Sequence, residues 1–141
     1  MADTLMKLKG AGDIIVAAIL AANPSLVYES VVARALHRWT GLHLSSAAAA
    51  PGFNHAIACM VAAVGIGSVV ASYQGPAARQ PIIVMNGVWA LLAGLTCATP
   101  REWQLGSATM LMTFLNGSIY TITMIFLSSS KKKGSKGKKG N

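Results

Sequence analysis

The stretch WQLGSATMLMTFLNGSIYTITMIFLSSS, residues 103–130, has no charged side chain over 28 positions, and KKKGSKGKKGN follows it directly. An α-helix needs about 20 apolar residues to cross the hydrocarbon core of a bilayer. A charged side chain at the bilayer centre costs about 2.5–3.5 kcal/mol on insertion scales, so a membrane helix excludes charge over this length. The stretch therefore predicts a transmembrane helix and an integral membrane protein.

Composition extends this prediction to most of the chain. Of the 141 residues, 53% are hydrophobic and 11% are charged, against about 25% charged residues in a typical soluble domain. The formal net charge is +8, but six of the twelve Lys and Arg residues follow Ser130. A nucleic-acid surface is therefore not expected. The expected partners are the bilayer itself and anionic lipid headgroups near the lysine-rich tail.

The spacing of the apolar runs predicts an all-α fold, a polytopic bundle of four transmembrane helices. Gly/Pro-containing or charged segments separate the runs. A membrane domain, residues 11–127, is expected between a cytosolic lead, residues 1–10, and a Lys/Gly-rich cytosolic tail, residues 128–141. The spans are expected at about 14–32, 55–73, 82–98 and 105–127.

The first of these spans has two features that set it apart. Pro24 lacks an N–H and clashes with the preceding turn, so we expect it to kink the helix. The segment could instead lie at the membrane interface. A cleaved secretory signal is disfavoured, because Asp13 borders the apolar run and Pro24 adjoins the only suitable cleavage point.

Charge counts predict the orientation. With four spans, both termini share a side with Arg79, and this side carries nine Lys and Arg residues. The opposite side carries three, Arg34, Arg38 and Arg101. The positive-inside rule then places both termini in the cytosol. A three-span protein would keep the tail in the cytosol and move the N-terminus across.

The chain ends Lys138-Lys139-Gly140-Asn141. Lysines three and four places from the C-terminus resemble the dilysine signal that returns membrane proteins from the Golgi to the endoplasmic reticulum. The resemblance implies a cytosolic tail and residence in the endoplasmic reticulum. The mitochondrial inner membrane is the alternative location, and the lysines could instead only contact anionic lipid.

Small residues recur every four positions in the three later spans. In lipid, such a face lets helix backbones approach closely, because packing drives association there. We expect helix packing, within the chain or with other membrane proteins, at Ala63, Gly67, Ala71, Ala90, Gly94, Thr113 and Gly117. Asn86 and Asn116 are expected to form a cross-helix hydrogen bond.

Catalytic signals are weak. The four acidic residues are dispersed, and Cys59 and Cys97 lie in apolar runs without metal-site spacing, so no metal and no cofactor are expected. No polar residues were found stacked along one helix face, which argues against a channel or transporter. Glu29 and His55 remain candidates as acid and base of an enzyme acting on a lipid-soluble substrate.

The segment HRWTGLHLSS, residues 37–46, resembles the quinone-site entry of the cytochrome b membrane subunit of succinate dehydrogenase. The resemblance implies a quinone pocket lined by Arg38 and Ser45. It covers ten to twenty residues and stops at Pro51-Gly52. The haem-ligand histidine that the family carries in the following helix is missing, because residues 82–98 contain no histidine.

As a whole, residues 9–127 resemble the small four-helix membrane proteins called DoxX-like. The shared pattern is a KGxG-type start (Lys9-Gly10-Ala11-Gly12), a kinked first helix, a longer connection and three Gly/Ala-rich spans. This resemblance implies a fold without a defined activity. We expect a non-catalytic accessory or scaffold protein for membrane-bound enzymes that handle lipid, sterol or other apolar metabolites. The alternatives are a quinone-binding anchor subunit and a membrane enzyme.

If the dilysine motif acts as a retrieval signal, replacing Lys138→Ser together with Lys139→Ser should move a fluorescently tagged protein from the endoplasmic reticulum to the Golgi or the cell surface. The matched control is Lys132→Ser with Lys133→Ser, which removes the same charge away from the motif. An unchanged reticular location of the first variant, or a mitochondrial signal from the unaltered protein, would refute the motif.

Overall fold

The computed structural model describes residues 1–136, and it describes side-chain surroundings through residue 129. Over this part of the chain the fold is all-helical, as predicted, with one isolated bridge between His43 and Ser107. The long helices are α1 (Ala2–Ala22), α4 (Pro51–Ala71), α5 (Arg79–Cys97) and α6 (Ala108–Lys136), and the short ones are α2 (Ser25–Tyr28), α3 (Val31–Thr40), η1 (Pro76–Ala78) and η2 (Arg101–Trp103).

Three segments are long and apolar enough to cross a membrane. These are Pro51–Ala71, Pro76–Cys97 and Ala108–Ser129 among the described residues. They overlap the second, third and fourth predicted spans, and the largest difference is at the start of the third, which begins at Pro76 and not at residue 82. The chain is therefore all-helical with three candidate membrane-spanning helices.

The predicted first span, a helix over 14–32 kinked at Pro24, is corrected. The helix begins at Ala2, inside the expected polar lead, and ends at Ala22. Asn23 precedes a proline and is therefore forced out of the helical region, with φ −154° and ψ 83°. Pro24 is the N-cap of the separate helix α2, which begins at Ser25. α1 contains four charged residues: Asp3, Lys7, Lys9 and Asp13. Because of these charges, α1 is not among the three segments that are apolar enough to cross a membrane.

The amphipathic helix α3 has clear ends. The Ser30 side chain accepts a hydrogen bond from the Ala33 amide at the start. Gly41 at the end has φ +68°, a left-handed conformation that glycine adopts without steric cost. Arg101 donates from Nη2 to the Thr40 carbonyl at 2.9 Å, which ties this helix to the α5–α6 connection.

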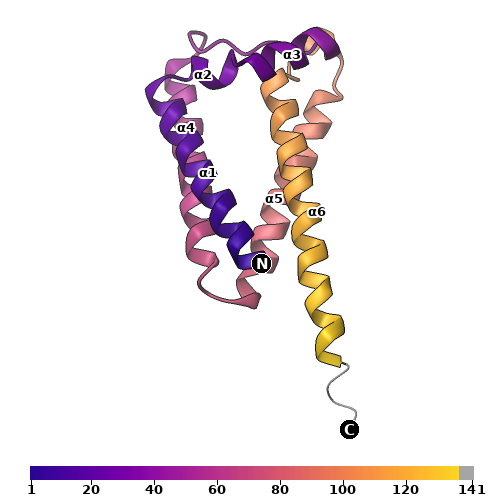
Figure 1. Cartoon of the computed structure of the whole chain (residues 1–141). Helices are drawn as coiled ribbons and strands as arrows, with labels where there is room; N and C mark the ends of the chain where they lie inside the picture. The colour runs from indigo at the N-terminus through magenta and orange to yellow at the C-terminus, as the bar shows by residue number, and fades with distance from the viewer. Residues whose placement is uncertain (137–141) are drawn as a thin grey trace.

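The four long helices form two antiparallel pairs, α1 with α4 and α5 with α6 (Figure 1). The N-terminus and the C-terminal end of α6 lie at the same end, and α2 and α3 lie across the other end. Two clusters of buried side chains join the elements. One contains Met6, Ile83, Tyr120 and Met124 near the N-terminus of α1, and the other contains Leu20, Tyr28 and Ala58 near α2.

Burial raises the pKa of the Tyr28 phenol above its ordinary value of 10.0, so this group stays uncharged at neutral pH.

Glycines set the closest approach within each pair. A Cβ atom added at Gly10 would lie 2.6 Å from the Gly65 carbonyl oxygen, and one at Gly65 would lie 2.8 Å from the Gly10 carbonyl oxygen. The backbones of α1 and α4 therefore touch at this crossing. In the second pair, Gly117 packs against Ala90, where an added Cβ would lie 2.9 Å from the Ala90 Cβ.

Replacing Gly65→Val should destabilise the protein by about 1–3 kcal/mol, the usual cost of overpacking, because the atoms in the way include the backbone of Gly10 and Ile14. Gly67→Val is the matched control, since a Cβ there meets nothing within 4 Å. The melting temperature of the detergent-solubilised protein can be measured from the monodisperse fraction left after heating. It should fall for Gly65→Val and not for Gly67→Val. Equal melting of the two variants would contradict the α1–α4 crossing.

Candidate functional site

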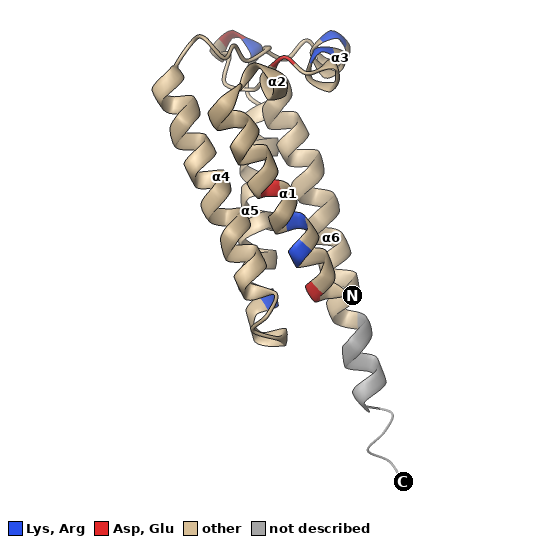
Figure 2. Cartoon of the chain, turned by 60° about the vertical axis from the view of Figure 1, so that its left-hand side comes forward, with Lys and Arg blue, Asp and Glu red and all other residues tan. Residues whose placement is uncertain are grey.

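Every charged side chain of α1 contacts a partner within the chain. The Arg79 guanidinium donates to both carboxylate oxygens of Asp3, from Nε and from Nη2, each at 2.8 Å. Lys7 Nζ lies 3.8 Å from the centre of the Tyr73 ring. Lys9 Nζ donates to both carboxylate oxygens of Asp13 one turn along the helix. Figure 2 shows these charges on α1 and Arg79, while the other coloured residues gather at the α2–α3 end.

The Lys9–Asp13 pair lies at the depth of the middle of α6. Lys9 Nζ is 5.7 Å from the centre of the Tyr120 ring. Tyr120 follows Ala108 by 12 residues and precedes Ser129 by 9, which is about 18 Å and about 14 Å along a helix. If Ala108–Ser129 crosses a bilayer, this ion pair is therefore near its midplane. The two side chains are only 15% and 14% exposed.

Tyr120 adds a second polar group at this level. The residue is 4% exposed, and its hydroxyl oxygen has no hydrogen-bond partner among the described residues. Buried polar groups in native proteins are almost always hydrogen-bonded, so an unpartnered hydroxyl needs an explanation. The hydroxyls of Ser68, Thr121 and Ser128 share this condition.

Above and below Tyr120, polar residues line one side of α6. Their positions follow steps of 4, 3, 4 and 3 residues, which keeps them on one face of a helix. We call this the polar face of α6, and it comprises Thr109, Thr113, Asn116, Tyr120 and Thr123. It is directed toward α1 at Tyr120 and toward the α3–α4 connection at Thr109, whose hydroxyl donates to Ser45 Oγ at 3.1 Å.

The polar face corrects the expectation that no polar residues stack along one helix. The hydroxyls of Thr113 and Thr123 donate hydrogen bonds within α6, to the backbone carbonyls of Thr109 and Ile119 respectively. Asn116 is exposed and makes no hydrogen bond within the described chain. The spacing was present in the sequence, but the high average hydropathy of the segment concealed it.

The expected hydrogen bond between Asn86 and Asn116 is not formed. Asn86 is buried and donates from Nδ2 to the Ile82 carbonyl oxygen, 2.9 Å away in its own helix. The Asn86 side chain thus bonds to the helix on which it lies and does not reach α6. Asn116 therefore remains available on α6.

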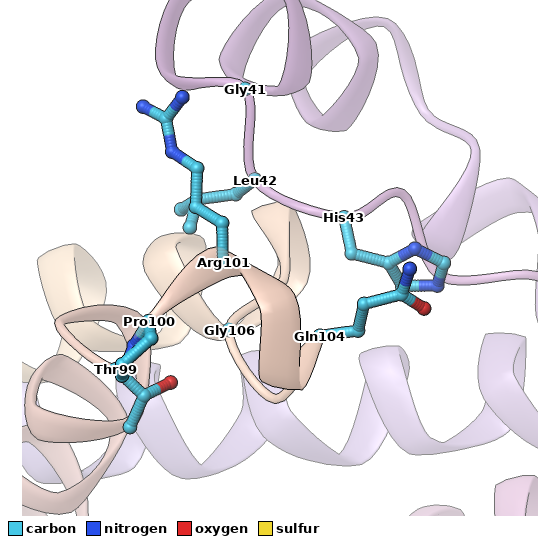
Figure 3. Close-up of a pocket in the computed structure, with 8 residues that line it drawn as sticks. All are labelled: Gly41, Leu42, His43, Thr99, Pro100, Arg101, Gln104 and Gly106. Carbon is cyan, nitrogen blue, oxygen red and sulfur yellow. The ribbon is translucent and has the colours of Figure 1, made fainter.

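Arg38 and Ser45, the residues implied by the quinone-site resemblance, are not brought together by any hydrogen bond within the described chain. Arg38 is exposed on α3, whereas Ser45 is held by Thr109. The small cavity in this region, about 20 Å³, is lined by Arg101 and Gln104 instead (Figure 3). In that view Arg101 extends beside Gly41, and the His43 and Gln104 side chains lie next to each other. This volume is about that of one water molecule, too little for a ring.

Glu29 and His55, the candidate acid and base, also make no mutual contact in the described structure. Glu29 is half-buried at the end of α2, where its backbone carbonyl accepts from Arg34 Nε at 2.7 Å. His55 is exposed at a groove of about 270 Å³ between α1 and α4. Cys59 lies in the same groove, and the remaining lining is aliphatic: Ile14, Ala17, Ala18, Ala21, Ala58 and Ala62.

The predicted small-residue positions fall into two groups. Ala90, Gly94 and Gly117 lie between α5 and α6, with Gly94 against the Phe114 ring, and Thr113 is half-buried on α6. Ala71 is half-buried at the end of α4 and packs on the cluster around Met6. Ala63 and Gly67 are exposed on the side of α4 that faces away from Gly65 and α1. Lys138 and Lys139 lie outside the described residues.

Among the residues that the structure describes, no group of three or more His, Cys, Asp or Glu side chains could hold a metal ion. Comparison of the chain with protein-family models, curated proteins and solved structures finds no match. The candidate site therefore rests on geometry, and it consists of Lys9, Asp13 and the polar face of α6. Sequence reasoning passed over Lys9 and Asp13 because it placed them before or at the edge of the first span.

If the Lys9–Asp13 pair lies in hydrocarbon, Lys9→Met alone should destabilise the protein by about 3 kcal/mol, since it leaves a carboxylate buried and unpaired. The double variant Lys9→Met with Asp13→Leu should recover most of this loss. Thermal melting of both single variants and the double variant gives the coupling as a double-mutant cycle. Additive single effects would show that the two groups are separately solvated by water.

Proposed function

We propose that the chain is a small integral membrane protein in which α1 is a fourth membrane helix. The pairing of all four α1 charges supports this proposal, since paired side chains are the form in which ionisable residues are tolerated in a bilayer. The antiparallel order of the long helices puts the N-terminus and the lysine-rich end of α6 on one side. The positive-inside rule makes that side cytosolic, and the endoplasmic reticulum is the proposed membrane.

Its proposed role is that of a non-catalytic accessory protein that binds helices of other membrane proteins. The observation that carries this is the outward face of α4, formed by Ala56, Met60, Ala63 and Gly67, all exposed. Steps of 4, 3 and 4 residues keep these four on one side of the helix. At Gly67 an added Cβ meets nothing within 4 Å, so the chain itself leaves this approach open.

The geometry suits a helix as the partner. Small residues at this spacing allow close backbone contact between helices in lipid, where no hydrophobic driving force exists between apolar surfaces. The same helix already uses Gly65 for such a contact with α1. The proposed clients are membrane-bound enzymes that handle lipid-soluble metabolites, which meet the protein within the bilayer.

Replacing Gly67→Leu should block partner helices without affecting the fold. Affinity purification in mild detergent, with quantitative mass spectrometry, should show at least a fivefold loss of the membrane proteins that copurify with the unaltered chain, a factor of about 1 kcal/mol. Gly12→Leu on α1 is the matched control, because a Cβ there also meets open space. Unchanged copurification with Gly67→Leu, or equal loss with Gly12→Leu, would contradict binding through this face.

A further inference from the structure

The polar face of α6 is the feature that the proposed accessory role does not use. It lies on α6 toward α1, whereas the proposed partner-binding face lies on the outer side of α4. Two of its groups lack partners in the described chain, the amide of Asn116 and the hydroxyl of Tyr120. They are four residues apart, so they lie about 6 Å from each other along the helix.

A bilayer core supplies no water for these groups, and an unsatisfied polar group there is strongly unfavourable. Thr113 and Thr123 avoid this cost by bonding to carbonyls of α6, but Asn116 and Tyr120 do not. A molecule that enters from the bilayer with its own hydrogen-bonding oxygen would satisfy both groups. One head group with a donor and acceptor oxygen can reach two side chains that are one helical turn apart.

The charge balance of the site selects an uncharged head group. Lys9 and Asp13 neutralise each other, and the polar face of α6 carries no charge at all. A phosphate or carboxylate would need a free cation at this depth, and Lys9 is already bound to Asp13. A hydroxyl or carbonyl group on an apolar body meets no such requirement.

Access to the site comes from the upper half of α6. Near the N-terminus of α1, the side chains of Ala2, Met6, Tyr120 and Met124 close the contact between the helix pairs. One turn above Tyr120, Asn116 is exposed, and on α1 Val16 is 38% exposed. In Figure 1 the two helix pairs lie farther apart toward α2 and α3 than near the N-terminus of α1. The chain therefore covers the polar face at Tyr120 and leaves it uncovered at Asn116.

We propose that Asn116 and Tyr120 of α6, with the Lys9–Asp13 pair, bind the hydroxyl or carbonyl group of an uncharged, lipid-soluble molecule at the middle of the bilayer. A second copy of the chain is the less favourable occupant. Its helix could contact the exposed Asn116 but not the buried Tyr120 hydroxyl.

The test uses the full-length protein in phosphatidylcholine vesicles with three photoactivatable, alkyne-tagged probes. The first is a sterol with a free hydroxyl, the second a diacylglycerol, and the third a phosphatidylserine that carries a charged head group. We expect saturable labelling of α1 or α6 peptides by the sterol or the diacylglycerol above the phosphatidylserine level. Whichever of the two neutral probes labels the protein identifies the class of lipid that supplies the hydroxyl.

Tyr120→Phe removes only the hydroxyl, and Asn116→Leu removes the amide. Each should lower specific labelling about fivefold, the scale of one lost hydrogen bond. Ser118→Ala is the matched control, because position 118 lies on the opposite side of α6 from Tyr120, and it should label as the unaltered protein does.

Three results would overturn the proposal: labelling by phosphatidylserine as strong as by the neutral probes, no specific labelling by either neutral probe, or labelling that both variants leave unchanged. Disulfide crosslinking of Asn116→Cys between copies, with no neutral-probe labelling, would identify a second copy as the occupant instead. None of these readouts depends on binding through the outward face of α4.

Discussion

Lipid offers no hydrogen bonds and little screening of charge, and the pairing of the charges on α1, the proposed fourth membrane helix, meets that constraint. Its four charged residues would exclude a lone helix from a bilayer, but each contacts a partner in the folded chain. Two of the partners, Tyr73 and Arg79, come from the α4–α5 connection and the start of α5. The charges therefore fix where α1 can lie, because any shift along α4 separates Asp3 from Arg79 and Lys7 from Tyr73. Pairing of this kind supplies position more than stability.

The small residues supply the contact that the charges position. Gly10 and Gly65 bring the backbones of α1 and α4 together, and Ala90 and Gly117 do the same for α5 and α6. Gly67 follows Gly65 by two residues, which is a rotation of about 200° around the helix. One glycine of α4 thus faces α1 and the other faces away from it. A single helix can hold its neighbour inside the chain and keep an equivalent surface open.

The three apolar spans could be predicted from sequence because charge exclusion is a local property of each run, visible without knowing what packs where. The first helix could not, because two of its charges, Asp3 and Lys7, contact residues 76 and 66 positions away, and hydropathy counts them only as costs. Pro24 was read as a kink, although the restriction it places on Asn23 ends the helix. The spacing of Ala63 and Gly67 predicted a packing face on α4 but not which neighbour it faces. Gly65, on the opposite side of the same helix, is the glycine that contacts α1. The polar face of α6 was readable from its 4-3-4-3 spacing, which an average over the segment does not reveal.

The position of the polar groups gives the charged first helix a reason beyond packing. An apolar α1 would cross Gly65 equally well, but it would leave the Tyr120 hydroxyl facing a surface with nothing polar to accompany it. With Lys9 and Asp13 at that level, polar groups from α1 and α6 gather in one place between the helix pairs, and the outer surface stays compatible with lipid. A neutral pair is suited to this position, because it provides a donor and an acceptor without attracting a counterion into the bilayer. In the proposed arrangement, the helix that costs most to insert is therefore the one that makes the interior of the protein polar enough to select a ligand.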